Sequence, residues 1–283
     1  MDILVSPQIE RLIRDALDED IGAGDLATMA TIPAECRGKG LFRAKKEGVV
    51  AGLVLLDRIF YFIDPKVAVR LFTKDGAQVQ PGTVVAEAEG PVRALLLAER
   101  TALNFLQRLS GTATLTRKYV DAVRGFHCKV LDTRKTTPGL RTLEKYAVRM
   151  GGGTNHRIGL YDAALVKDNH IEATGSIAEA VKAVRRHAPF MAKVEVEAGN
   201  LKQVEEALAA GADVIMLDNM SLSEMAEAVR LVNKRAWIEA SGGITLENIR
   251  QVAETGVDFI SSGALTHSAP IVDFNMKITI NEA

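Results

Sequence analysis

VEVEAGNLKQVEEALAAGADVIMLDN, residues 194–219, joins two apolar runs through one helical pattern. Apolar runs end in polar residues at six positions along the second half of the chain: Asp132, Lys167, Glu197, Asp218, Ser241 and Ser262. The last four ends are 21, 23 and 21 residues apart, which is the length of a strand followed by a helix. This spacing predicts parallel strands that are connected by helices.

Helical patterns fill the intervals between these runs, at residues 140–150, 177–187, 201–210, 222–232 and 246–255. Six strand–helix units within residues 112–283 predict an incomplete α/β barrel of six to seven strands. A doubly wound parallel sheet is the alternative. No G-x-G-x-x-G pattern follows a predicted strand, which disfavours a dinucleotide-binding fold.

Residues 1–111 have a different pattern. An amphipathic helix is predicted at residues 7–19 and a leucine-rich helix at residues 92–109, with extended segments at 40–44, 67–72 and 76–90. We therefore predict an α+β domain over residues 1–111 and a barrel domain over residues 112–283. The tail 273–283 could return to the first domain.

The composition excludes several classes of protein. The 283 residues carry 35 basic and 36 acidic side chains, and this balance disfavours a nucleic-acid-binding protein. The two cysteines, Cys36 and Cys128, have no metal-binding or redox spacing and are predicted to be core residues in a reducing compartment. No secretory or membrane-spanning segment is recognisable, so we predict a cytoplasmic protein with no membrane partner.

The predicted strands end in unusually polar sequences: DTRK, VKDNH, EVE, MLDN, EASGG and ISSGA. Any one of them could be a helix cap, but six in succession favour a functional site. In α/β barrels the active site lies at the carboxyl ends of the strands.

Cations are concentrated at the first of these strand ends. Arg134, Lys135, Arg157 and Lys167 follow strands or lie in loops, where they could converge on an anion that bears carboxylate or phosphate groups. A lone histidine is more often structural, but His156 follows three glycines and precedes Arg157, so we predict a site role for it. Three further cations at helical spacing are expected to form a solvated helix face: Arg141, Lys145 and Arg149.

Carboxylates and glycines occupy the later strand ends. Glu197 and Asp218 end adjacent strands and could cap helices, bind sugar hydroxyls or bind Mg²⁺ together with substrate phosphate. Glu195 would share the face of Glu197 and support it. The loops after the last two strands are typical of phosphate sites in barrels, and their residues are Ser241, Gly242, Gly243, Ser262, Gly263 and Ala264.

Long segments of the chain resemble the quinolinate phosphoribosyltransferase family, the carboxylating nicotinate-nucleotide pyrophosphorylases. The segments are ERTALNFLQRLSGTAT (99–114), LDTRKTTPGLRTLEKYAVRMGGGTNHRIGLYDAALVKDNHI (131–171), EVE, IMLDN, EASGGI and SSGALTHS. The resemblance covers nearly the whole chain. It implies an α/β sandwich domain followed by an incomplete α/β barrel.

The resemblance also implies residue roles. It assigns the quinolinate pocket to Arg100, Arg134, His156, Arg157 and Lys167. Thr133 and Lys135 would be further substrate contacts, and the two strand-end loops would bind the 5-phosphate. The implied catalytic residues are Lys135, Glu197 and Asp218, of which the two acids would bind ribose and Mg²⁺.

The implied reaction transfers phosphoribosyl from phosphoribosyl pyrophosphate to quinolinate, with decarboxylation and no organic cofactor. Its products are nicotinate mononucleotide, CO₂ and pyrophosphate, in NAD biosynthesis. Two alternatives remain: a pyridine phosphoribosyltransferase that does not decarboxylate, and a non-catalytic barrel that binds phosphorylated metabolites.

The family implies a homodimer with shared active sites, although a higher oligomer is possible. In such a dimer Arg100 would reach the partner's pocket. The helical pattern places Arg100 on one polar face with Asn104, Gln107 and Arg108, opposite Leu95, Leu96, Leu103 and Leu106.

Overall fold

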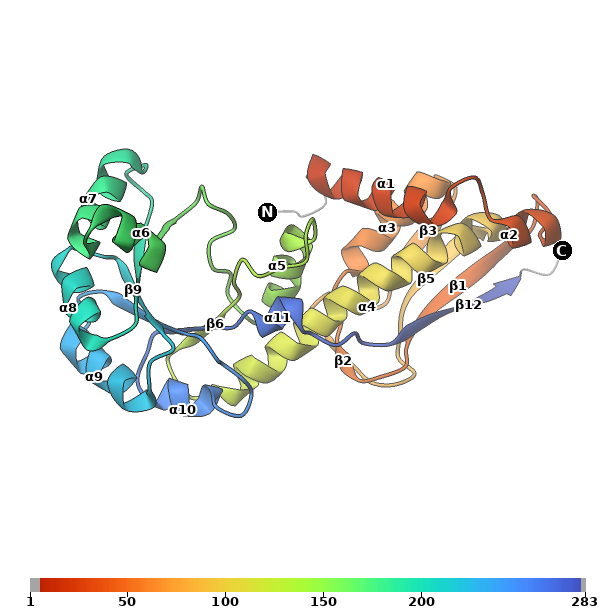
Figure 1. Cartoon of the computed structure of the whole chain (residues 1–283). Coiled ribbons are helices and arrows are strands. Elements are labelled where there is room, and N and C mark those ends of the chain that lie inside the picture. The colour runs from red at the N-terminus through yellow and green to blue at the C-terminus, as the bar shows by residue number, and fades with distance from the viewer. Residues whose placement is uncertain (1–5, 281–283) are drawn as a thin grey trace. The chain divides into compact units, whose positions relative to one another are not determined.

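The computed structural model describes residues 6–280, so residues 281–283 of the predicted tail lie outside the described part. The chain forms two compact units (Figure 1). The first contains residues up to 115, then 138–152 and the segment from 269 onward; the second contains residues 116–137 and 153–268. The predicted domain boundary after residue 111 lies within one long helix and stays a prediction.

The first unit is built on a four-stranded antiparallel sheet in the order β12–β1–β5–β3. β12 brings the C-terminal segment beside β1, and β2 pairs with β4 in a separate two-stranded antiparallel sheet. The strands are β1 (Arg37–Ala44), β2 (Gly48–Val49), β3 (Ala68–Leu71), β4 (Gln78–Val79), β5 (Val84–Pro91) and β12 (Phe274–Ile280). The helices are α1 (Pro7–Ile21), α2 (Leu26–Thr31), α3 (Leu53–Ile63), α4 (Val92–Ala122) and α5 (Arg141–Met150).

Two helices of this unit follow from their apolar faces. The sequence pattern places Ile9, Leu12, Ile13 and Leu17 on one stripe of α1, and the structure buries Ile9, Ile13 and Leu17 and leaves Leu12 partly buried. α4 was expected to end at Leu109, and this expectation is wrong, because the helix continues to Ala122. Gly111 allows α4 to lie close to the segment that precedes β12, because a Cβ at this position would lie 2.1 Å from the Pro270 carbonyl oxygen. The small residues after Leu109 therefore serve close packing and do not end the helix.

Two predicted solvent-facing surfaces of this unit are partly covered. Lys145 was expected on a solvated face but is only 3 % exposed, on the same helix as the fully buried Glu144. Glu144 accepts a hydrogen bond from Arg108 Nη2 at 2.8 Å, and Gln107 donates to the Phe274 carbonyl. On α4, therefore, Arg100 is exposed as predicted, whereas Gln107 and Arg108 form hydrogen bonds within the unit. Helical spacing shows which residues share a face but not what covers that face.

The second unit contains six parallel strands in the order β6–β11–β10–β9–β8–β7, and this confirms the incomplete α/β barrel. Within the described residues β6 and β7 are edge strands, and Thr154 adds a single bridge beside Leu131 of β6. The strands are β6 (Lys129–Leu131), β7 (Ala164–Val166), β8 (Val194–Ala198), β9 (Val214–Asp218), β10 (Trp237–Ser241) and β11 (Phe259–Ser261).

Helices cover the outer side of this sheet, as α7 to α10 show in Figure 1. Their bounds are α6 (Asp168–Thr174), α7 (Ile177–His187), α8 (Leu201–Ala209), α9 (Leu222–Val232), α10 (Ile249–Glu254) and α11 (Ala264–His267). α7 and α9 match their predicted ranges. Among residues 6–280, none of the helices combines the length and the apolar character that crossing a bilayer requires.

Aspartates hold the starts of two barrel strands. Asp213, just before β9, accepts a hydrogen bond from the Val194 N–H at 2.8 Å, and Asp258, just before β11, accepts one from the Ile238 N–H at 2.9 Å. Each carboxylate thus satisfies a donor at the start of the neighbouring strand. Burial opposes ionisation of Asp213, but the Val194 N–H and the Arg185 guanidinium lower the pKa of its carboxyl.

Replacing Asp213 by alanine is expected to lower the free energy of unfolding by about 1–3 kcal/mol, because the buried Val194 N–H loses its acceptor. Since the pKa of Asp213 is lowered by folding, its ionic contribution is present above the unfolded-state pKa and is lost as the pH falls through the folded-state pKa. The difference from wild type should therefore shrink in acid. Urea unfolding at neutral and acidic pH measures it, and equal stabilities at neutral pH would contradict the prediction.

Candidate active site

A pocket of about 640 Å³ lies in the second unit, at the carboxyl ends of the barrel strands. Its volume is within the range of roughly 300–1,000 Å³ that is common for ligand pockets. The residues that line it are Thr133, Arg134, Lys135, His156, Arg157, Leu165, Lys167, Glu197, Met216, Asp218, Asn219, Glu239, Ser241, Gly242, Gly243 and Ser261. The structure thus brings together most of the predicted site residues, from segments far apart in the sequence.

Arginines and lysines occupy one side of the pocket, after β6 and before and after β7. Arg157 is partly buried, and its guanidinium Nη1 donates to the Ala163 carbonyl at 3.2 Å. Burial and the neighbouring Arg134 lower the pKa of Arg157, and Glu195 and Asp162 compensate only in part. A guanidinium remains charged under such conditions, so this side of the pocket favours an anionic ligand.

Acids line the same pocket at the ends of β8 and β9, next to these cations. Glu197 Oε2 lies 3.2 Å from Lys167 Nζ, so the structure pairs two residues to which we assigned different substrates. Asp218 accepts a hydrogen bond from Asn219 Nδ2 at 2.9 Å, which orients its carboxylate. Two carboxylates that end adjacent strands and line one pocket fit Mg²⁺, which takes one or two protein carboxylates and completes its shell with water and phosphate oxygens.

The loop after β10 has a backbone that requires glycine. Gly242 and Gly243 have φ values of +90° and +61°, and a Cβ at Gly242 would lie 2.3 Å from Asn219 Oδ1. Asn219 is itself left-handed at φ 53° and donates its backbone N–H to the Ser241 carbonyl at 3.0 Å. The loops after β9 and β10 are therefore packed tightly together, with exposed glycine backbone at the pocket.

The loop after β11 is arranged differently from our expectation. Ser262 is buried, donates its hydroxyl to the Ile244 carbonyl at 3.3 Å and donates its N–H to the Leu131 carbonyl at 3.1 Å. The preceding residue, Ser261, is the one that lines the pocket, and its hydroxyl donates to Ser241 Oγ at 3.1 Å. Gly263 lies beside the Lys135 side chain, with its built Cβ position 3.0 Å from Lys135 Cδ, whereas Ala264 begins α11.

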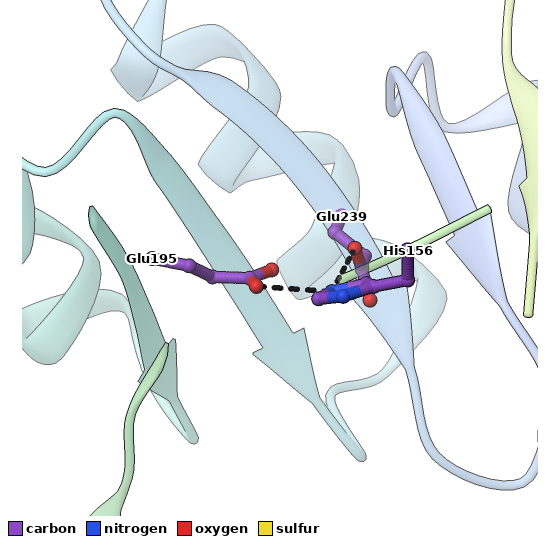
Figure 2. Close-up of side chains that lie close together, drawn as sticks. All are labelled: His156, Glu195 and Glu239. Carbon is purple, nitrogen blue, oxygen red and sulfur yellow. Dashed lines mark ion pairs between the residues drawn. The ribbon is translucent and has the colours of Figure 1, made fainter. Parts of the chain in front are cut away.

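His156 lies in a buried cluster with two glutamates that extend from β8 and β10 (Figure 2). His156 Nε2 is 3.0 Å from Glu195 Oε2 and 3.3 Å from Glu239 Oε2. Glu195 is 5 % exposed and Glu239 is 1 % exposed. The other oxygen of each carboxylate, Oε1, is buried without a hydrogen-bond partner among the described residues.

Two observations bear on the protonation of this cluster. Burial opposes a charge on the His156 ring, whereas its hydrogen bonds with Glu195 and Glu239 act in the other direction and raise the pKa of His156. However, His156 Nδ1 accepts a hydrogen bond from the Arg157 N–H at 2.7 Å. In a ring protonated on both nitrogens, the Nδ1–H would point at the Arg157 N–H, and two donors would face each other. The hydrogen bond therefore selects the neutral ring with its proton on Nε2.

The surroundings of Glu195 favour its protonated form. Burial raises the pKa of Glu195, against the lowering effect of His156, and the adjacent Glu239 carboxylate adds to the rise.

Five pocket residues were not predicted as site residues: the apolar Leu165 and Met216 and the polar Asn219, Glu239 and Ser261. Asn219 and Glu239 each stand next to or within quoted strand-end motifs, and alternation along β10 places Glu239 on the same face as Ser241. The two-residue period of a strand could therefore have indicated Glu239. Arg100 lies in the other compact unit, where its side chain is exposed.

Comparison with known proteins identifies the family. A model of the quinolinate phosphoribosyl transferase N-terminal domain matches residues 25–110, and a model of the C-terminal domain matches residues 112–277. The chain belongs to the quinolinate phosphoribosyltransferase family.

Curated relatives and a solved structure agree with this assignment. A probable carboxylating nicotinate-nucleotide pyrophosphorylase from Synechocystis is 46 % identical over 99 % of this chain and 94 % of its own length. One from Bacillus subtilis is 47 % identical over 97 % of this chain and 94 % of its own. The crystal structure of NadC from Streptococcus pyogenes is 46 % identical, with a TM-score of 0.94 over 98 % of this chain and 99 % of that one.

The chain is therefore an enzyme of the transferase class, and the alternative of a non-catalytic barrel is rejected. The comparison also confirms the family inferred from the quoted motifs. The identity of the family does not by itself assign roles to individual residues, and those roles depend on the geometry of the pocket.

Proposed function

We propose that the barrel pocket transfers phosphoribosyl from phosphoribosyl pyrophosphate to quinolinate and releases CO₂, with nicotinate mononucleotide and pyrophosphate as the other products. The observation that carries the proposal is a single pocket lined by four cations, Arg134, Lys135, Arg157 and Lys167, and by two strand-end carboxylates, Glu197 and Asp218. Quinolinate has two carboxylates next to each other on its ring, and a pocket of this kind can hold both.

The cations bind and orient quinolinate. Arg134, Arg157 and Lys167 would hold its two carboxylates, with the ring nitrogen directed toward C1 of the phosphoribosyl group. Thr133 and Lys135 form the turn beside them and complete the substrate contacts. Holding both reactants in line lowers the entropic part of the barrier.

The acids act on the other substrate. Displacement of pyrophosphate at C1 builds positive charge on the ribose, and the carboxylates of Glu197 and Asp218 would stabilise that charge as it develops. The same two residues would hold Mg²⁺, which supplies charge neutralisation for the departing pyrophosphate. The 5-phosphate would lie against Ser241, Gly242 and Gly243, with Ser262, Gly263 and Ala264 at the adjacent loop.

Decarboxylation follows from the first step. Once the ring nitrogen bonds to C1 it becomes a pyridinium, so the electron pair of the breaking bond to the 2-carboxylate can be stabilised at C2 beside the positive nitrogen. A proton then takes the place of CO₂ at C2.

An assay with quinolinate, phosphoribosyl pyrophosphate and Mg²⁺ tests this proposal, with CO₂ and nicotinate mononucleotide as the measured products. Nicotinate replaces quinolinate in the control reaction. Equal turnover of nicotinate without CO₂ would favour the alternative of a transferase that does not decarboxylate. The names of the relatives support the decarboxylating reaction.

We further propose a homodimer in which Arg100 completes the pocket of the partner subunit. The support is that Arg100 is exposed on α4, with the neighbouring Asn104 also exposed and with Leu95, Leu103 and Leu106 buried behind them. An exposed arginine contributes little to stability, so a loss of activity on removing Arg100 would report on its role in the site and not on the fold.

Complementation tests the shared site. Arg100→Ala and Lys167→Ala should each be nearly inactive, because each removes a carboxylate contact from every pocket. Unfolding the two variants together and refolding them gives random dimers, half of which are mixed and carry one intact site of two. Recovery of up to about a quarter of wild-type activity is expected. A mixture that stays inactive despite demonstrated subunit exchange would contradict an Arg100 contribution in trans.

Two further predictions stay open. We propose the domain boundary at residues 111 and 112, and its support is that the two family models end at 110 and begin at 112. The cytoplasmic location stays a prediction from the sequence.

A further inference from the structure

His156, Glu195 and Glu239 form a cluster in which both glutamates approach the histidine ring (Figure 2). Glu195 and Glu239 lie on β8 and β10, which are separated by β9, and both side chains reach across the inner face to one ring nitrogen. Of the two glutamates only Glu239 lines the pocket. The mechanism above gives neither of them a task.

One use of such a cluster would be to hold a metal ion, since its ligand-type atoms all lie within 4.8 Å of one another. The hydrogen bonds of the ring exclude this use. A histidine that binds a metal through Nε2 carries its proton on Nδ1 and donates from there. In this cluster His156 Nδ1 accepts the Arg157 N–H at 2.7 Å, so the proton must be on Nε2, where it faces the glutamates.

We propose that Glu195 and Glu239 are positioning residues of the quinolinate site: they hold His156 in its Nε2–H form, so that Nδ1 fixes the backbone of Arg157. The inference rests on the proposed function, because it assigns Arg157 to quinolinate. His156 then acts on the substrate through Arg157, since both of its ring nitrogens are engaged within the protein.

The local chain explains why Arg157 needs this support. Residues 155–163 contain neither helix nor strand, so no backbone ladder sets their course. Asp132, which is fully buried, accepts the His156 N–H at 2.8 Å and Asn155 Nδ2 at 2.6 Å. The glutamate pair fixes the ring of His156, and the ring in turn fixes the amide of Arg157. Three buried carboxylates thereby set the direction of one guanidinium.

A bidentate contact between arginine and a carboxylate depends strongly on direction. If the backbone of Arg157 were free to rotate, its guanidinium would still be charged, but it would bind quinolinate in several orientations. Loss of the cluster should therefore weaken quinolinate binding specifically, and should leave the acids at the ends of β8 and β9 able to serve phosphoribosyl pyrophosphate and Mg²⁺.

Two double variants separate the hydrogen bond from the charge. Glu195→Leu with Glu239→Leu removes every acceptor, whereas Glu195→Gln with Glu239→Gln keeps an amide oxygen for the Nε2–H. The leucine pair is expected to raise the KM for quinolinate about tenfold or more, and the glutamine pair to keep it within about threefold of wild type. The KM for phosphoribosyl pyrophosphate and the Mg²⁺ requirement should change little in either.

Ile238→Val is the matched control for weakened packing, because Ile238 is buried on β10 directly beside Glu239. It should lower stability without raising the quinolinate KM. An equal rise in the KM of both substrates, or a glutamine pair as defective as the leucine pair, would overturn the inference. If wild type turns over quinolinate and both double variants match it, the proposed function stands and the inference fails.

Nuclear magnetic resonance of the wild-type enzyme decides the point even if the leucine pair does not fold. With ¹⁵N-labelled histidine, only five residues contribute signals, and the His156→Gln variant assigns the relevant pair. The expected pattern is an unprotonated Nδ1 and a protonated Nε2 at neutral pH. Protonation of both nitrogens, or of Nδ1 alone, would overturn the inference.

Discussion

Replacing Arg157 by alanine is expected to lower kcat/KM for quinolinate by about 30- to 1,000-fold while the fold remains intact. The loss corresponds to about 2–4 kcal/mol, the cost of removing a charge-assisted contact with a carboxylate in a partly buried pocket. Arg157 is a strong candidate for this effect because burial and Arg134 lower its pKa, so its charge is incompletely compensated within the protein. The unliganded cation is thus ready for an anionic partner.

Arg230→Ala provides the matched control, since Arg230 is an exposed arginine on α9, outside the residues that line the pocket. It should have wild-type kinetics. Steady-state measurements with each substrate varied in turn give the comparison, and thermal unfolding shows that both variants are folded. Wild-type kinetics for Arg157→Ala would remove Arg157 from the quinolinate site.

The barrel could be predicted from the sequence because its strands are short, buried and regularly spaced. Six apolar runs end in polar residues, and the structure places a strand at each of the six positions. The same regularity predicted the pocket, since parallel strands bring their carboxyl ends to one edge of the sheet. Lys167 and Glu197 could therefore be expected in one pocket, although not as the ion pair that they form.

Other features depend on contacts between distant residues and leave little trace in a local pattern. Glu195 and Glu239, on strands separated by β9, both contact His156 Nε2, and no spacing along the chain indicates that they share this partner. Lys145 was misplaced because a helical period says nothing about the segment that packs against that face. The predicted end of α4 at Leu109 was too early, because the pattern did not show that Gly111 lies against the backbone of Pro270.

Asp218→Asn is expected to lower kcat/KM for phosphoribosyl pyrophosphate by about 100-fold or more and to raise the Mg²⁺ concentration needed for activity. A neutral amide of nearly the same size loses the charge that Mg²⁺ and an oxocarbenium-like transition state require. Quinolinate binding should change much less, because the proposed function assigns its two carboxylates to Arg134, Arg157 and Lys167 and not to Asp218. Mg²⁺ titrations of activity and direct binding of quinolinate to the unliganded enzyme measure the two effects separately.

The same substitution at the other end of β9 separates charge in the pocket from strand stability. Asp213→Asn changes an aspartate just before this strand, where it serves the Val194 N–H, and Asp213 does not line the pocket. It should lower the free energy of unfolding while leaving the Mg²⁺ titration unchanged. Asp218→Asn should instead change the Mg²⁺ titration and leave the free energy of unfolding unchanged. If Asp218→Asn instead left the Mg²⁺ titration unchanged and weakened only quinolinate binding, Asp218 would belong to the quinolinate side of the pocket, and Glu197 alone would remain to bind the metal ion.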